Sequence, residues 1–344
     1  MSRPTIADLA QAAGVSLSTV NRLLHGTGTV RPATVQRIMA TAEEIGFYGL
    51  GAIRERSRIA LPRYKLGFLL QQSHRQLYRM FGDSIVAAAA RRKDAVVEPT
   101  VHFEDDLTPE AIAANLLNLG ERTDGVALVA ADHPLIGQAI ESLRAKGVPV
   151  ITYITDQSAP SRAGYVGTDN WKLGRTAAWF INQTKLRPGK IVTFIGNHRY
   201  HCQDIADASF RSYIREHAPN TIVADAVPTQ EEPENAYRIV RSLMRQEPDL
   251  IGFFVGGGGI SGVLRAVREV PLERQREIRI VCRDIGPETR KGLSEGLITA
   301  ALCHPLERTS DELIDVMLGA IAGGAAGSIV QRIVPFETVT PECV

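Results

Sequence analysis

The stretch "TIADLAQAAGVSLSTVNRLLHG", residues 5–26, decides the fold of the N-terminal part of the chain. It has the pattern of one amphipathic helix, except that "AGVS" interrupts it. Thr5 and Asp8 form a T-x-x-D capping pattern, which predicts a helix from about Ile6. Gly14 ends this helix, because glycine readily adopts the left-handed conformation at a helix C-terminus, and Ser16 is a typical N-cap for a second one. The interruption therefore predicts two short helices that cross at a tight turn.

A third helix is predicted in "RPATVQRIMATAEEIGF", residues 31–47. Pro32 suits the first turn of a helix, and Gly46 marks its end. Apolar residues recur on one face between these two positions. Helix, short turn and helix is the arrangement in which the second helix enters the major groove of DNA. The first 48 residues are therefore predicted to form a three-helix DNA-binding head.

Residues 5–48 closely resemble the head of the lactose-repressor (LacI) family, whose motif runs T-x-x-D-x-A-x-x-A-G-V-S-x-x-T-V-S-R-x-L-N. The matching residues are Thr5, Asp8, Ala10, Ala13, Gly14, Val15, Ser16, Thr19, Val20, Arg22 and Leu24. Asn21 and His25 replace the serine and asparagine that are usual in the family. The resemblance implies that Leu17, Ser18 and Arg22 face base edges.

Side-chain chemistry agrees with this implication, because an arginine pairs with guanine O6 and N7 through two hydrogen bonds. Ser16, Thr19 and His25 are candidate phosphate contacts, which position a protein on DNA without reading sequence. Positive charge gathers here: residues 1–65 hold nine Lys and Arg against four Asp and Glu, whereas the whole chain has a net charge of +1. The alternative is a three-helix module that binds protein, with Arg22 as a solvated surface charge.

The segment "GLGAIRERSRIALPRY", residues 49–64, is predicted to be a hinge or linker. LacI-family members commonly carry a P-N-x-x-A-R-x-L pattern there, and its leucine enters the minor groove. This chain has Gly49 in place of the proline and Arg56 near the leucine position. Ile53 is a candidate substitute for the leucine, arginines of the segment are candidate backbone or minor-groove contacts, and a solvated tether is the alternative. The predicted DNA-binding residues are Thr5, Ser16, Leu17, Ser18, Thr19, Arg22, His25, Ile53 and Arg54.

From residue 65 onward, apolar runs typical of strands alternate with helical stretches. Such alternation indicates α/β architecture with parallel sheet flanked by helices. Ten or eleven strands are close to the limit for one twisted sheet, so two doubly wound sheets are predicted. Two lobes of this kind are similar to the effector-binding core of the LacI family and to periplasmic sugar-binding proteins. The predicted division is a first lobe at about 65–165 and 299–328, and a second at about 166–298 and 329–344.

Loops that follow strands are the expected source of ligand contacts, because ligands of such folds bind at the carboxyl ends of the strands. Carboxylates, amides and aromatic rings in these loops suit a sugar or polyol. Aspartates at helix starts have a second interpretation as N-caps. The predicted effector-binding residues are Gln72, Ser73, Arg75, Tyr78, Asp169, Asn170, Trp171, Asn197, His198, Arg199, Gly257 and Asp284.

Two further motifs give weaker signals. The glycines of "VGGGGISG", residues 255–262, are interpreted as a close approach of the backbone to the effector or a neighbouring lobe; a phosphate cradle or plain turn chemistry are the alternatives. "HRYHC", residues 198–202, lacks a convincing fourth ligand for a metal site. No nucleophile and base pattern is recognisable. We therefore expect no metal, no cofactor and no enzyme activity.

The sequence thus predicts a transcriptional regulator, expected to be a repressor, whose affinity for a near-palindromic operator depends on a small molecule. Homodimerisation is expected because one small head offers too little interface for specific binding. The N-terminus lacks a secretory signal and the chain lacks an apolar span, so a cytoplasmic protein without membrane association is expected. The rival interpretation is a cytoplasmic solute-binding protein or sugar-modifying enzyme with an incidental helical head.

Overall fold

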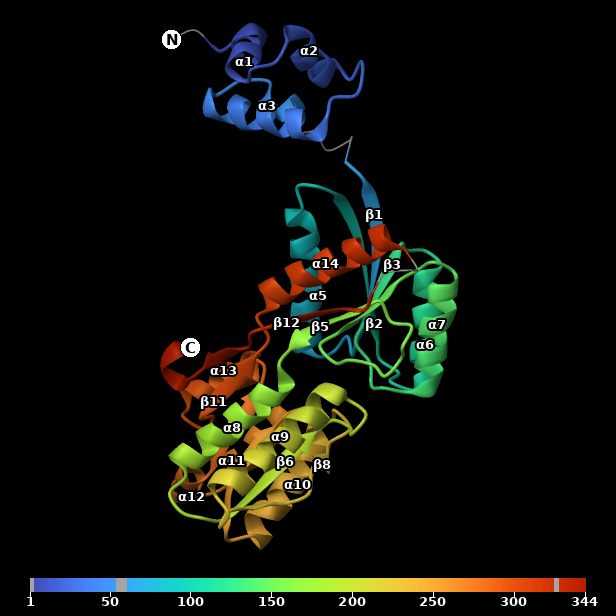
Figure 1. The fold of residues 1–344 in the computed structure, drawn as a ribbon. Coiled ribbons are helices and arrows are strands. Elements are labelled where there is room, and N and C mark those ends of the chain that lie inside the picture. The colour runs from blue at the N-terminus through green and yellow to red at the C-terminus, as the bar shows by residue number, and fades with distance from the viewer. Residues whose placement is uncertain (1–2, 54–60, 325–327) are drawn as a thin grey trace. The chain divides into compact units, whose positions relative to one another are not determined.

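The computed structural model describes residues 3–53, 61–324 and 328–344 (Figure 1). The chain falls into two compact units, residues 1–64 with 90–98 and residues 65–89 with 99–344. We call residues 3–53 the head and the described residues from 61 onward the core. Arg54 of the predicted DNA-binding set lies outside the described residues.

The head contains the three expected helices, α1 (Ile6–Ala12), α2 (Leu17–His25) and α3 (Pro32–Glu44). The Thr5 hydroxyl accepts a hydrogen bond from the Asp8 N–H, and the Asp8 carboxylate accepts one from the Thr5 N–H, which completes a capping box. Gly14 has a φ of 61°, and Ser16 caps α2 by accepting from the Thr19 N–H. The interruption of the opening stretch therefore ends one helix and begins the next, as predicted.

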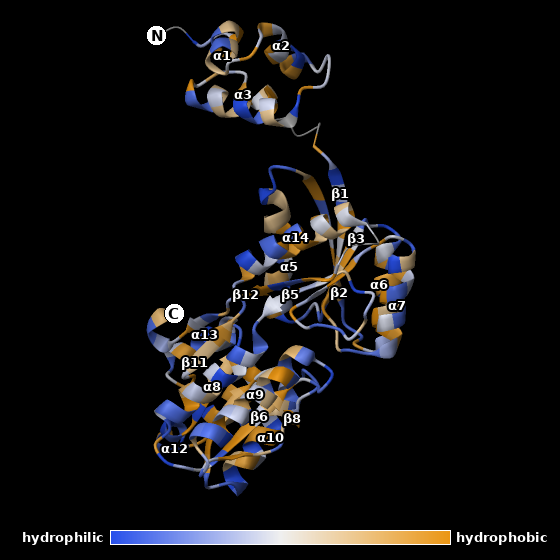
Figure 2. Ribbon diagram, in the orientation of Figure 1, coloured by the Kyte–Doolittle hydropathy of each residue, from blue (hydrophilic) through white to orange (hydrophobic). Residues whose placement is uncertain are grey.

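Apolar residues on the inner faces of the three helices form the centre of the head. The fully or nearly buried ones are Leu9, Ala10, Ala13, Val20, Leu23, Ile38, Ala42, Phe47 and Ile53. Orange and blue residues alternate along these helices in Figure 2, as amphipathic helices require. Ile53 is fully buried in this cluster and lies in a helical stretch that starts at Leu50. This corrects the expectation that Ile53 is available to enter the minor groove, because its side chain already belongs to the apolar centre of the head.

The core contains two mainly parallel sheets, as the alternating sequence pattern predicts. The first sheet has the order β12-β5-β4-β3-β1-β2. Helices α6 and α7 cover one face of it, and α5 and α14 lie on the other (Figure 1). We call this sheet and its helices the first lobe. Its elements are β1 (Arg63–Gln71), α5 (Gln76–Arg91), β2 (Val96–Glu104), α6 (Pro109–Gly120), β3 (Gly125–Leu128), α7 (Pro134–Ala145), β4 (Val150–Tyr153), β5 (Gly164–Thr168), α14 (Leu306–Gly323) and β12 (Val330–Val334).

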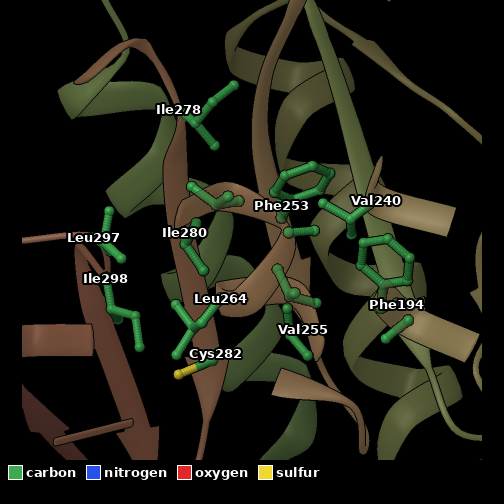
Figure 3. Close-up of a cluster of buried hydrophobic side chains, with 14 of the residues drawn as sticks. Phe194, Val240, Phe253, Val255, Leu264, Ile278, Ile280, Cys282, Leu297 and Ile298 are labelled. Atoms are coloured by element: carbon green, nitrogen blue, oxygen red, sulfur yellow. The ribbon is translucent and has the colours of Figure 1, made fainter. Parts of the chain in front are cut away.

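The second sheet has the order β13-β11-β10-β9-β6-β7, with β8 also paired to β6. Its large apolar cluster lies under α10 and α11 and includes Phe194, Phe253 and Ile280 (Figure 3). A second cluster lies under α8 and α9. We call this part the second lobe. Its elements are α8 (Asn170–Thr184), β6 (Lys190–Ile195), α9 (His201–His217), β7 (Ile222–Val223), β8 (Val227–Pro228), α10 (Pro233–Gln246), β9 (Leu250–Val255), α11 (Ile260–Arg268), α12 (Leu272–Glu277), β10 (Arg279–Arg283), α13 (Pro287–Ser294), β11 (Ala300–Cys303), β13 (Glu337–Val339) and the 3₁₀ turn η1 (Pro341–Cys343).

The strand pairing moves the predicted lobe boundaries at three strands. All of β5 pairs in the first sheet, whereas the expected division was near residue 166. β11 belongs to the second sheet, through its parallel register with β10, and β12 belongs to the first, through its register with β5. The chain therefore crosses between the lobes after β5, after β11 and after β12. β5 and β11 read as apolar runs, so the sequence pattern marked these two strands but not the sheet that each joins, whereas β12, with Gln331 and Arg332 in its middle, was not predicted as a strand. In the described ranges, no helix has the length and apolar character needed to cross a bilayer.

Candidate functional site

The outer face of α2 is exposed and carries no acidic residue in its first turn. Ser16, Leu17, Ser18, Arg22 and His25 are exposed, and Leu17 is 49 % exposed although it is a large apolar residue. Val20 and Leu23, on the opposite face, are buried. A helix that is anchored through one face and leaves its N-terminal turn open is suited to docking in the major groove of DNA.

Hydroxyl groups gather at the start of α2. The Ser16 Oγ lies 2.9 Å from the Ser18 Oγ and 2.8 Å from the Thr19 Oγ1. Arg22 lies over the same turn, and its Nη2 donates to the Thr19 Oγ1 at 3.3 Å. Hydroxyls, a guanidinium and the positive end of a helix together favour phosphate and base-edge acceptors. The sequence placed all four of these residues on this surface, and Thr5 is exposed at the start of α1.

A cavity of about 400 Å³ lies in the core, between the two lobes. The first lobe contributes the start of α5 and Ile154, the second contributes Gln203, Glu231, the glycines 256–259 and the segment 283–289, and His304 comes from the crossing after β11. Tyr78 and Phe81, both on α5, supply aromatic rings. Because the walls come from the carboxyl ends of strands and the N-terminal ends of helices, the cavity occupies the place where α/β folds of this type bind ligands.

An ion pair joins the two lobes at this cavity. The Nη1 of Arg75 lies 2.5 Å from the Oε2 of Glu231, and both side chains are largely buried. Gln203 Nε2 donates to the other carboxylate oxygen of Glu231 at 2.9 Å. Arg75 also donates to Gln72 Oε1 at 3.1 Å. Burial lowers the pKa of Arg75, but the charge and hydrogen bond of Glu231, together with Tyr78 and Tyr200, outweigh this effect, so the pKa is raised and the guanidinium stays charged.

The glycine run beside this pair is explained by close packing. A Cβ on Gly258 would collide with the Glu231 carboxylate and with Arg75, and a Cβ on Gly257 would collide with the N–H of Gly196 and with Gln203. Gly259 has a φ of 105°, which a side chain rarely allows. The run therefore brings the backbone close to charged groups of the cavity wall.

A second polar network surrounds Asp284. Its Oδ1 accepts hydrogen bonds from the N–H and the Nδ1 of His304, both at 2.8 Å. Arg283 Nη2 lies 2.5 Å from the His304 Nε2, and an arginine is always a donor, so this Nε2 accepts and the proton of the neutral imidazole resides on Nδ1. Burial raises the pKa of Asp284, but His304 and Arg283 outweigh it and the pKa lies below its ordinary value. Burial lowers the pKa of His304.

Backbone strain concentrates at the same place. Among the described residues, the non-glycine positions with positive φ are Gln72, Ile154, Gln230, Glu231 and Asp284. Ile154, Glu231 and Asp284 line the cavity, Gln72 bonds to Arg75, and Gln230 precedes Glu231. Such conformations cost about 1–3 kcal/mol each and cluster at ligand sites. The strain therefore marks this cavity as the candidate functional site of the core.

The "HRYHC" segment fastens the second lobe to the first. The N–H of Asp132 donates to the Arg199 carbonyl at 2.8 Å, and His201 Nε2 lies 3.3 Å from Asp132 Oδ2. The Tyr200 hydroxyl donates to Gln71 Oε1, and the Cys202 N–H donates to the Thr155 hydroxyl. In the described part of the chain, no group of three or more His, Cys, Asp and Glu is placed to hold a metal ion.

The structure brings together part of the predicted effector set. Arg75, Tyr78, Gly257 and Asp284 line the cavity. The remaining predicted residues are not part of the lining: Gln72, Ser73, Asp169, Asn170, Trp171, Asn197, His198 and Arg199.

Several of these residues have other structural roles. Asp169 caps α8 by accepting from the Lys172 N–H, which is the alternative that its position at a helix start left open. Ser73 bonds to Asp105, and Trp171 is 49 % exposed on the surface. Asn170 supports the site indirectly, because its Oδ1 accepts from Arg283 at 2.8 Å.

Sequence reasoning missed Gln203, Glu231, Arg283 and His304. His304 directly follows β11, and Arg283 is the last residue of β10, so the rule that selected Asp284 applies to both. Glu231 is the third residue after the two-residue strand β8, and only the charged run "TQEEPE" marked it in the sequence. Gln203 is a buried residue in the first turn of α9, and no pattern in the sequence distinguishes it.

Comparison with known families divides the chain at the same place as the structure. Residues 5–49 match the family described as bacterial regulatory proteins, lacI family, and residues 67–325 match the periplasmic binding protein domain. The HTH-type transcriptional regulator GalR of Lacticaseibacillus casei is 25% identical over 294 residues, 80% of this chain and 81% of that protein. The maltose regulon regulatory protein MalI of Escherichia coli is 47% identical over 57 residues, 17% of this chain and 15% of its own length.

Solved structures similar to the core include sugar-binding proteins. GanP, a glucose-galactose binding protein from Geobacillus stearothermophilus, has a TM-score of 0.72 at 18% identity and covers 81% of this chain and 98% of its own. An ABC transporter solute binding protein from Agrobacterium vitis, bound with alpha-D-tagatopyranose, has a TM-score of 0.72 at 17% identity and covers 81% of this chain and 95% of its own. At these identities, the similarity establishes the fold of the core.

Proposed function

We propose that this chain, which belongs to the lacI family of bacterial regulatory proteins and carries a periplasmic-binding-protein domain, is a repressor controlled by a sugar or polyol. The family makes it a DNA-binding transcriptional regulator and not an enzyme. We propose three further properties: that it represses transcription, that its effector is a sugar or polyol, and which residues bind the DNA and the effector. We assign DNA reading to the three helices within residues 1–48, the connection to residues 49–64 and effector binding to residues 65–344.

The exposed face of α2 is the proposed DNA-reading surface. Arg22 donates to a guanine, Leu17 and Ser18 contact neighbouring base edges, and Ser16 and Thr19 hold phosphates. Thr5 is exposed at the start of α1 and His25 at the end of α2, and these two residues complete the proposed phosphate contacts. Two heads on one near-palindromic operator double a small interface, so we propose a cytoplasmic homodimer as the active form.

The cavity between the lobes is the proposed effector site. The observation that carries this assignment is that all five positive-φ residues other than glycine, among those described, lie at or beside it. Asp284, Gln203 and Gly257 supply acceptors and backbone donors for hydroxyl groups, and Tyr78 and Phe81 cover one face of a ring. The "HRYHC" contacts link the two lobes when they lie close together. A ligand that binds between the lobes and stabilises this closed arrangement changes the population of states that bind DNA.

The experiment that tests this proposal is a mobility shift with the DNA upstream of the gene itself, with and without each member of a panel of neutral sugars and polyols. We expect sequence-specific binding that at least one member of the panel weakens. Asp284→Ala is expected to abolish this response while the uninduced protein still binds DNA. A response that survives Asp284→Ala contradicts the assigned site, and a response that strengthens DNA binding contradicts the repressor-inducer relation.

A further inference from the structure

The effector cavity contains more negative than positive formal charge. Arg75 and Arg283 are the arginines in its lining, and Glu231, Asp284 and Glu288 are the carboxylates. His304 is neutral by the hydrogen-bond argument above. Helices α11 and α13 begin at the cavity without side-chain caps, and their N–H groups by themselves favour an anion. Whether the cavity can bind an anionic ligand therefore depends on whether Arg75 or Arg283 is available to pair with it.

Both Nη atoms of Arg283 are engaged by groups of the wall. Its Nη1 donates to Asn170 Oδ1 and its Nη2 donates to Thr168 Oγ1, both at 2.8 Å, and Nη2 also lies against the His304 Nε2. The side chain is 6% exposed. A ligand carboxylate that approached it would have to displace these partners and would meet Asp284, which lies 4.0 Å from the Arg283 Nε.

Arg75 is the remaining cation, and its partner is an acid. An anionic ligand can take this guanidinium only by separating it from Glu231, whose side chain is 5% exposed. Removing one partner of a buried ion pair leaves an uncompensated buried charge, which is strongly unfavourable. Gln203 would then be the single donor left to Glu231 among the hydrogen bonds that the structure gives this carboxylate.

We infer that the Arg75–Glu231 pair is a charge filter that makes the cavity selective for neutral polyhydroxylated ligands and excludes their carboxylated or phosphorylated counterparts. The inference rests on the proposed effector function and names the class of effector. A hydroxyl group can bond to Asp284, to Gln203 or to the glycine N–H groups without breaking the pair. A carboxylate at the same position competes with Glu231 for Arg75.

The charge filter makes a testable prediction. Removing the charge of Glu231 should turn a cavity that excludes anions into one that binds them. Glu231→Gln keeps the shape of the side chain and leaves Arg75 without its counter-ion inside an enclosed site. A hydrogen bond to a charged group is worth about 1.5–3 kcal/mol, which corresponds to roughly a tenfold to hundredfold gain in affinity for an anion.

Inorganic phosphate is the probe for this consequence, because it needs no knowledge of the effector. Thermal-shift titrations with phosphate, at constant ionic strength against chloride, compare the wild type with Glu231→Gln. We expect little saturable stabilisation of the wild type and a clear, saturable one of Glu231→Gln. Adding Arg75→Met to Glu231→Gln should abolish it, and Glu231→Asp, which keeps the charge, should behave like the wild type.

A matched control exists on the surface. Arg175 is bonded through both of its Nη atoms to the Glu216 carboxylate, in an exposed pair. Glu216→Gln also frees an arginine from its acid, but it creates no enclosed site, so phosphate should not stabilise it beyond the wild type. An equal gain in both glutamine variants, or no gain in a folded Glu231→Gln, overturns the filter.

The second arm uses ligand pairs that differ in one group, such as D-galactose and D-galacturonate, titrated by calorimetry. The filter predicts that the wild type binds the neutral member of any effective pair at least about tenfold more tightly, and that Glu231→Gln narrows or reverses the ratio. A wild type that binds the acid as tightly as the neutral sugar contradicts the filter. If no neutral sugar or polyol binds, the proposed effector class fails, whereas the phosphate result still tests the filter separately.

Discussion

The head and the core were specified by the sequence in different ways. In the head, each turn of the chain is set by a local rule: a capping box at Thr5, a left-handed glycine at Gly14 and a serine cap at Ser16. In the core, the functional residues come from segments far apart in the chain, and Arg75 meets Glu231 across 156 positions. Local rules predict a small helical module almost residue by residue, whereas a site between two lobes depends on contacts that have no local signal.

The two regions also expose their functional groups differently. The α2 surface of the head leaves Arg22 and its neighbouring hydroxyls in solvent, where they can meet a large partner such as DNA. The core surrounds Arg75, Glu231 and Asp284 with protein, and it holds several of its cavity residues in strained conformations. Exposed groups suit a polymer that approaches from outside, and enclosed groups suit a small ligand.

The largest difference between the two regions is expected when a buried side chain in the small apolar centre of the head is shortened, which leaves a cavity there. Ile38 is fully buried there, and Ile38→Ala should cost about 2–5 kcal/mol. Because a module of this size has little stability to lose, we expect the head to unfold and DNA binding to disappear while the core still melts cooperatively. Calorimetry and a mobility shift measure both outcomes.

Ile280→Ala is the matched control, because Ile280 is equally buried in the core. It should lower the melting temperature of the core and leave the signals of the head unchanged. A single transition that both variants lower equally would show that the two regions do not behave as separate folding units.

A smaller effect is expected from a methyl group on the glycine run of the core. Gly258→Ala places a Cβ against the Glu231 carboxylate and the Arg75 guanidinium. Overpacking costs typically about 1–3 kcal/mol, and here it should also separate the ion pair and weaken effector binding. Denaturant melts and calorimetry with an effective sugar check this expectation.

Gly14→Ala is the comparison in the head. A Cβ on Gly14 meets no atom within 4 Å, although its φ of 61° is strained for alanine. Its effect should be a loss of about 1 kcal/mol in head stability, with effector binding unchanged. Equal losses of effector binding in the two variants would remove the steric explanation of the glycine run.

The smallest effect is a pH dependence of core stability. The pKa of Asp284 is lower in the folded protein than the ordinary value for an aspartate, because His304 and Arg283 outweigh the effect of burial. Its carboxylate therefore stabilises the folded state above the unfolded pKa of about 3.9, and this contribution is lost as the pH falls through the lower folded value. Urea melts of the core from pH 6 to pH 3 should show less acid destabilisation in Asp284→Asn than in the wild type. An identical acid profile would contradict the ionised Asp284.

Sequence patterns predicted the fold class, the helices of the head and nearly every strand, because hydrophobic periodicity and caps are local signals. They did not predict which sheet β11 joins, because a short apolar run does not specify its partner strand, and they did not mark β12, whose sequence VQRIV contains Gln331 and Arg332. In the cavity, the rule of strand ends identified Arg75 and Asp284 but also selected Asp169, which caps a helix. Glu231 stayed hidden because its partner Arg75 lies in the opposite lobe, and Gln203 stayed hidden because no pattern distinguishes it within its helix.

The measurement that tests the account most directly is quantitative footprinting of the upstream DNA by the wild type, Arg22→Ala and Arg37→Ala. Arg37 is exposed on α3, so its variant removes the same charge from another helix. We expect Arg22→Ala to lose about 1–3 kcal/mol of specific binding and to relax the preference at one base pair, while Arg37→Ala keeps the sequence preference. Unchanged protection and unchanged sequence preference in Arg22→Ala would contradict the assignment of α2 as the helix that reads DNA.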